Sequence, residues 1–205
     1  MSIPCLTLAA GALAGISGCA DLGMTSLSSA ANAAQQTQPA MRWDHREEAN
    51  EWTKSTIAAI ASHDVELASA VPADVNAWCP GYPSASLSDR RAFWSGLLSA
   101  VAKYESSWNP TVSGAGGRYI GLLQISSQTA LNYRCEANSS TELKVGSANL
   151  ECAVEIMAAQ VGRDGKISGN GNRGIARDWG PMKSAGKRAD MAAWTSAQTY
   201  CRQAP

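Results

Sequence analysis

One carboxylate stands out because of the residues on either side of it. Glu105 ends an apolar stretch and opens the block Glu105–Pro110, and a second block, Gly121–Ile125, surrounds the single amide of Gln124 with apolar residues. A carboxyl group held against an apolar surface loses hydration of its charged form, so its pKa rises. Such a group stays protonated near neutral pH and can act as a general acid. The two blocks together predict a catalytic glutamate at the edge of an apolar pocket.

A buried helix is predicted to carry Glu105 at its C-terminal end. Ser88 is the expected N-cap, and Pro110 prevents the helix from continuing past the glutamate. Between them apolar residues recur with a period near 3.6, at Phe93, Trp94, Leu97, Leu98, Val101 and Tyr104. The candidates for the apolar wall beside the carboxyl are Trp108, Leu122 and Leu123. A rise of about 2 units from the ordinary glutamate pKa of about 4.3 would then suit acid–base work.

The rest of the chain predicts a mainly α fold with few strands. Helical patterns are expected at residues 42–63, 127–133, 149–161 and 187–202. In the first of these the candidate inner positions are Trp43, Trp52, Ile57 and Ile60. Residues 113–117 and 162–174 read as glycine-rich loops, and residues 122–125 as a short strand or a tight turn.

The N-terminal residues predict export. Residues 1–19 are uncharged and apolar, which is typical of a secretory signal and too short for a comfortable membrane span. The run Ile16-Ser17-Gly18-Cys19 resembles a bacterial lipobox, in which Cys19 would become the lipidated first residue. No Lys or Arg precedes the apolar run, so an ordinary signal peptide cleaved elsewhere is the alternative. We expect the periplasm, with contact to the outer membrane only through a lipid at Cys19.

Composition shifts divide the remaining chain into three segments. Residues 20–40 are rich in Ser, Ala, Gln and Thr and are predicted to be a flexible tether. Residues 41–83 are predicted to be a helical N-terminal extension, and residues 84–205 the catalytic domain. The whole chain has 17 basic and 17 acidic residues, and this zero net charge argues against nucleic acid as the main partner. The sequence does not indicate an oligomeric state.

Four cysteines remain beyond the leader, and we expect them to form disulfides rather than a metal site. An even number of cysteines in an exported chain favours disulfides, and four allow three pairings. The preferred pairs are Cys135–Cys152, close in sequence, and Cys79–Cys201, which would join the start of the domain to its end. The only histidines, His45 and His63, lie far from Glu105, so neither a zinc site nor any other cofactor is expected.

The two blocks around Glu105 carry a resemblance to a known family. Glu105-Ser106-x-Trp108-Asn109-Pro110, followed by Ser113 and then Gly121-Leu122-Leu123-Gln124, resembles the signature of the soluble lytic transglycosylases across roughly residues 90–200. The resemblance implies a lysozyme-like, goose-type fold and cleavage of the bond between N-acetylmuramic acid and N-acetylglucosamine in peptidoglycan strands. Family members use no water: the 6-hydroxyl of the muramic acid closes onto its anomeric carbon and leaves a 1,6-anhydro end. Glu105 would serve as acid and then as base.

The same resemblance implies roles for other residues. Ser113 would orient the acetamide or the intermediate, Gln124 would hydrogen-bond a sugar, and Leu123, where the family usually has Met, would pack on a sugar face. Asn149 lies in a segment that resembles a helix supporting the cleft and is counted among the substrate-binding residues. The usual Ala-Tyr-Asn-Ala-Gly motif is absent.

Residues 176–180 stand at about the place of that missing motif. There Trp179 could stack on a sugar and Asp178 could contact substrate. Asp178 also leaves a second reaction open, because a carboxylate at about 6.5–9.5 Å from Glu105 could activate water in a lysozyme-type hydrolase. A non-catalytic glycan-binding envelope protein with the same fold is the third interpretation.

Overall fold

The computed structural model describes residues 38–202 of the chain. The predicted signal peptide, the lipidation site at Cys19 and nearly all of the predicted tether lie outside the described residues. Within residues 38–202, no helix combines the length and apolar character needed to cross a membrane.

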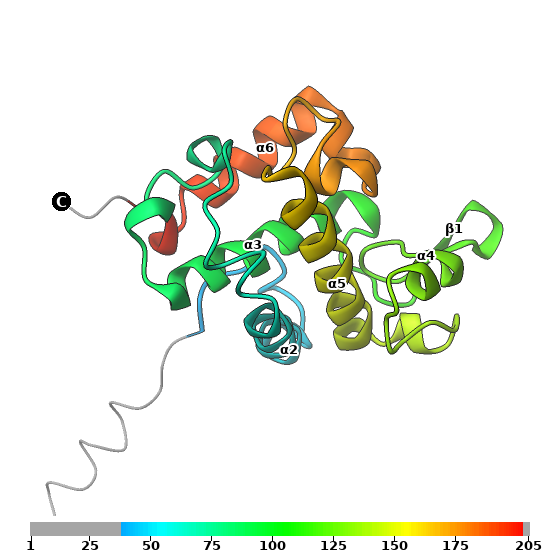
Figure 1. Ribbon diagram of the computed structural model, residues 1–205. Helices are drawn as coiled ribbons and strands as arrows, with labels where there is room; N and C mark the ends of the chain where they lie inside the picture. The colour runs from blue at the N-terminus through cyan, green and yellow to red at the C-terminus, as the bar shows by residue number, and fades with distance from the viewer. Residues whose placement is uncertain (1–37, 203–205) are drawn as a thin grey trace, which may run out of the picture. The chain divides into compact units, whose positions relative to one another are not determined.

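The described part of the chain is mainly helical, as predicted. The helices are α2 (Ala49–Ser62), α3 (Leu87–Glu105), α4 (Ser127–Asn132), α5 (Gly146–Asp164) and α6 (Ala185–Ser196), joined by turns and short 3-10 helices. The two strands, β1 (Ser113–Gly114) and β2 (Tyr119–Ile120), form a small antiparallel hairpin in which Ser113 pairs with Ile120. Figure 1 shows this hairpin next to α4, away from α2 and α6.

Helix α3 is the core of the domain and positions Glu105. Every residue from Ala92 to Ala102 is buried, and α2 and α6 both pack against the helix (Figure 1). The helix begins two residues earlier than predicted: Ser86, not Ser88, is the N-cap and accepts the Asp89 N–H at 3.1 Å. Ser86 has the extended backbone that an N-cap requires, whereas Ser88 is already helical. The predicted end of the helix at Glu105 is confirmed.

Residues 41–83, predicted as an extension, pack in the same compact unit as the rest of the described chain. Trp43, Trp52 and Ile60 lie in the core, as predicted. Ile57 is only partly buried, and Thr56 takes the inward position by donating its hydroxyl to the Trp52 carbonyl at 2.6 Å. The segment therefore contributes side chains to the core of the domain.

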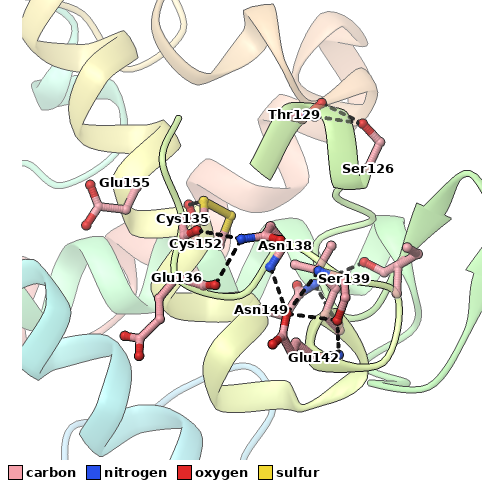
Figure 2. The surroundings of a disulfide bond; sticks show 12 residues. Ser126, Thr129, Cys135, Glu136, Asn138, Ser139, Glu142, Asn149, Cys152 and Glu155 are labelled. Atoms are coloured by element: carbon pink, nitrogen blue, oxygen red, sulfur yellow. Dashed lines mark hydrogen bonds between the residues drawn. A yellow bond between two sulfur atoms is a disulfide. The ribbon is translucent and has the colours of Figure 1, made fainter. Parts of the chain in front are cut away.

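Both predicted disulfides are present. Cys79 and Cys201, 122 residues apart, join the two ends of the domain, with their Cα atoms 4.7 Å apart. Cys135 and Cys152 have Cα atoms 5.0 Å apart, and Figure 2 shows this bridge fastening the loop before Asn138 to α5. Asn149 lies on the same helix, less than one turn from Cys152. The short bridge thus fixes the loop against the helix that carries Asn149.

Candidate active site

Glu105 lies where the buried stripe of α3 reaches solvent. Residues four and seven positions before it, Val101 and Leu98, are fully buried and share its side of the helix. Partial burial raises the pKa of the Glu105 carboxyl to about 7, and the positive charge of Lys187 opposes the rise. Burial disfavours the charged form, so the cause of the rise is desolvation. The carboxyl is thus balanced between its two protonation states near neutral pH.

The chain turns sharply after Glu105. Ser107 and Trp108 both have positive φ, 51° and 58°, which is uncommon for residues other than glycine. Trp108 holds the turn by donating its indole N–H to the Ser99 carbonyl at 2.8 Å, with the His45 ring 4.6 Å away edge-on. Ser99 lies six residues before Glu105, about 120° round the helix. The indole therefore packs on another side of α3 than the Glu105 side chain.

The second block forms a tight turn rather than a strand. Ile120 and Ile125 exchange backbone hydrogen bonds at 3.1 and 3.0 Å across it. Gly121 has φ of 76°, and a Cβ there would lie 2.2 Å from the Leu143 carbonyl oxygen, so this position requires glycine. Gln124, with φ of 48°, donates its amide to the Gly121 carbonyl at 2.9 Å and to the Val112 carbonyl at 3.4 Å.

The turn places the Gln124 side chain against strand β1, which contains Ser113. The Gln124 amide oxygen lies against Gly114, where an added Cβ would be only 2.6 Å from it. Gly114 follows the exposed Ser113 in β1. The Gln124 side chain thus lies beside the residue that follows Ser113, and the roles of Ser113 and Gln124 toward a substrate stay predictions.

Asn149 does not face a substrate. It is fully buried on α5, and its amide makes three hydrogen bonds to backbone. It accepts the Leu123 N–H at 2.8 Å and donates to the carbonyls of Ile120 and Leu143, both at 3.0 Å. The expectation of direct substrate contact is wrong because this amide has no exposed face. Asn149 holds the turn that carries Gln124.

Leu123 and Trp179 are also buried, at 0% and 3% exposed. Neither side chain offers a surface on which a sugar could stack, so these two expectations are wrong as well. The Trp179 indole donates its N–H to the Leu123 carbonyl at 2.9 Å, which ties residues 176–180 to the same turn. This contact replaces stacking as the reason for a tryptophan here. Leu122 is fully buried beside Leu123.

Asp178 is exposed, but its carboxylate already has partners. One oxygen accepts hydrogen bonds from the Tyr133 hydroxyl at 3.3 Å and from the Gln160 amide. The structure therefore joins Asp178 to Tyr133 and to α5.

A polar cluster next to Glu105 was missed by the sequence reasoning. Asp190 accepts two hydrogen bonds from Arg42, at 2.6 and 3.1 Å, and one from the Tyr104 hydroxyl at 2.7 Å. Lys103 lies 3.4 Å from the same carboxylate. Arg42 and Asp190 are 148 residues apart, so no spacing in the sequence connects them. The adjacency of Tyr104 to Glu105 was the only available signal.

The helical fold, with a half-buried glutamate at the end of its central helix, is lysozyme-like. The profile of the transglycosylase SLT domain matches residues 83–188, and the chain belongs to this family. Solved structures of Bd0314 DslA share the fold: a glutamate-to-glutamine mutant has a TM-score of 0.73 and 26% identity over 80% of this chain and 99% of that chain. The wild-type form 2 has a TM-score of 0.72, with the same identity and coverage. No curated protein matches the sequence.

Proposed function

We propose that this protein is a peptidoglycan lytic transglycosylase with Glu105 as its single acid and base. The observation that carries the proposal is the Glu105 carboxyl, whose pKa of about 7 follows from its place at the end of a buried helix. Membership of the transglycosylase SLT domain family supports a glycan-cleaving enzyme and a peptidoglycan substrate. An exported protein, anchored through Cys19, would meet this substrate in the periplasm.

The proposed reaction uses the Glu105 proton twice and consumes no water. The protonated carboxyl gives its proton to the oxygen that links muramic acid to N-acetylglucosamine, and the bond from that oxygen to the anomeric carbon breaks. The 6-hydroxyl oxygen of the muramic acid then bonds to the anomeric carbon, and its proton returns to Glu105. A group with a pKa near the working pH is suited to both transfers. Ser113 and Gln124, at the hairpin, would contact the sugars.

The carboxyl of Glu105 is also free to meet the substrate. Within residues 38–202, its pKa is influenced by burial and by one lysine, with no hydrogen-bond partner. A carboxyl committed to an internal hydrogen bond would have to break it before each proton transfer. The absence of such a bond among these residues supports a catalytic role over a structural one.

Analysis of the products tests the proposal. Mass spectrometry of muropeptides released from sacculi should show 1,6-anhydro ends, which are lighter than reducing ends by one water. Reducing ends alone would instead establish a hydrolase and bring Asp178 back as the residue that activates water. Binding of sacculi without any release would favour the non-catalytic glycan-binding alternative.

The pH dependence of the reaction follows from the raised pKa of Glu105. The first step needs the protonated carboxyl, so kcat/KM should be constant in mildly acidic buffer and fall tenfold per pH unit above about 7. The measurement is kcat/KM between pH 4 and pH 9, with circular dichroism confirming the fold at each pH. A midpoint near the ordinary glutamate value of 4.5 would show that the carboxyl is solvated, against the proposal.

A further inference from the structure

Lys187 brings a positive charge to the edge of the proposed active site. It lies in the first turn of α6, which packs against α3 (Figure 1), and its side chain is exposed. Its ammonium lies 5.1 Å from the centre of the Tyr104 ring. Tyr104 directly precedes Glu105, and the Lys187 charge lowers the pKa of that carboxyl. Lys187 therefore lies beside the residue that precedes Glu105, and its charge acts on the Glu105 carboxyl.

The surroundings of Lys187 carry an excess of positive charge. Arg42 and Lys103 both pair with Asp190, whose pKa they and the Tyr104 hydroxyl hold well below its usual range. The single carboxylate of Asp190 thus pairs with two cations. Lys187 forms no ion pair within the described residues. The cluster is positive in a chain whose formal net charge is zero. Such a local field attracts anions to the cleft.

We propose that Lys187 binds a carboxylate of the peptidoglycan strand next to the bond that is cleaved, and so favours anionic strands. This inference rests on the proposed function. Muramic acid carries a lactyl group whose carboxyl is free in peptide-free strands. In peptide-bearing strands that carboxyl forms an amide, and the peptide supplies carboxylates of its own. An ammonium and a carboxylate form a strong, charge-assisted hydrogen bond.

The place of Lys187 beside Tyr104 suits a role in binding. Lys103 also lies 5.1 Å from the centre of the Tyr104 ring, but its ammonium is paired with Asp190 at 3.4 Å. Lys187 has the Tyr104 ring as its neighbour and leaves its hydrogen-bond donors available. A bound carboxylate would also cancel the charge that lowers the pKa of Glu105, so the acid would hold its proton more firmly in the complex.

The experiment compares Lys187→Met, Lys187→Arg and the control Lys54→Met, which removes an exposed lysine on α2. Each variant is assayed on peptide-bearing strands, on peptide-free strands, and on peptide-free strands whose lactyl carboxyl has been reduced to an alcohol. Lys187→Met should raise KM about 10-fold on the strands whose carboxylate is bound, with little change in kcat. On the reduced strands it should match the wild type. Lys187→Arg should restore KM, and Lys54→Met should behave as wild type on all three.

Comparison of the three strand types identifies the source of the carboxylate. A loss confined to peptide-bearing strands assigns it to the peptide, and a loss confined to peptide-free strands assigns it to the lactyl group. Equal losses on all three strand types, or no loss on any, would overturn the inference, since the lysine would then act only through Tyr104 or not at all. Calorimetric binding of the same strands to Glu105→Gln protein, with and without Lys187→Met, tests the carboxylate contact even if the wild type releases no product. Failure of the proposed function is thereby separable from failure of this inference.

Discussion

Glu105→Gln is expected to lower kcat on peptidoglycan by about 10³-fold or more, because one side chain performs both proton transfers. Glutamine has nearly the same shape but can neither donate the proton that releases the sugar nor take it back. The measurement is release of soluble muropeptides from sacculi at pH 6, where most of the wild-type carboxyl is protonated. Glu47→Gln, which changes an exposed glutamate, is the matched control and should keep wild-type activity.

The same variant should be more stable than the wild type at high pH. The folded-state pKa of Glu105 is about 7, above the ordinary 4.5, so the folded protein binds the proton more tightly. The stability from this proton is fully present below about pH 4.5 and is lost as the pH rises through about 7. Glutamine is neutral throughout, so Glu105→Gln should gain roughly 3 kcal/mol at pH 8 and nothing at pH 4.

Denaturant unfolding at pH 4 and pH 8 checks this gain. An equal stability change at both pH values would mean that the carboxyl is not desolvated in the folded protein. Full activity of Glu105→Gln would remove the basis of the proposed chemistry altogether. A stable, inactive variant would instead show the trade between stability and function that a buried catalytic acid implies.

The parts of the fold that the sequence predicted depend on local patterns. The 3.6-residue period of the apolar residues placed Glu105 at the end of a buried helix. That period can be read from the sequence because it depends only on which residues are apolar. The pairing of Cys79 with Cys201 followed from parity, from separation and from the need to close the domain. Both were confirmed.

The errors concern a choice between two neighbouring caps and contacts made at long range. Ser86 and Ser88 are chemically equal as caps, and only the backbone direction selects Ser86. Asn149 and Trp179 were expected to contact the sugar because the family resemblance placed Asn149 in a helix that supports the cleft and Trp179 in the place of the missing motif. Their partners are backbone groups of residues 120, 123 and 143, at sequence separations of up to 56 residues. No spacing in the sequence reveals such a partner.

Asn149→Leu is expected to destabilise the fold by about 4 kcal/mol and to abolish activity. Leucine has a similar size but leaves the Leu123 N–H and the Leu143 carbonyl buried without partners, and it removes one of the two hydrogen bonds to the Ile120 carbonyl. Each unsatisfied group costs about 1 to 3 kcal/mol. Because these groups belong to or adjoin the turn that carries Gln124, the turn should lose its conformation before the helices unfold. Denaturant unfolding and muropeptide release measure the two effects.

Comparison with Asn132→Leu and Asn149→Asp separates positioning from general stability. Asn132 is exposed at the end of α4, so its replacement should change stability by less than about 0.5 kcal/mol. Aspartate keeps the acceptor for the Leu123 N–H but sets its other oxygen against the carbonyls of Ile120 and Leu143, so Asn149→Asp should be tolerated only as the protonated acid and should lose stability as the pH rises. One outcome is that Asn149→Leu is fully folded and still cleaves glycan at the wild-type rate. In that case the hydrogen bonds of Asn149 serve stability alone, and the turn holds Gln124 in place without them. Loss of activity in protein that remains folded would show that a buried amide, out of reach of any sugar, sets the geometry of the site.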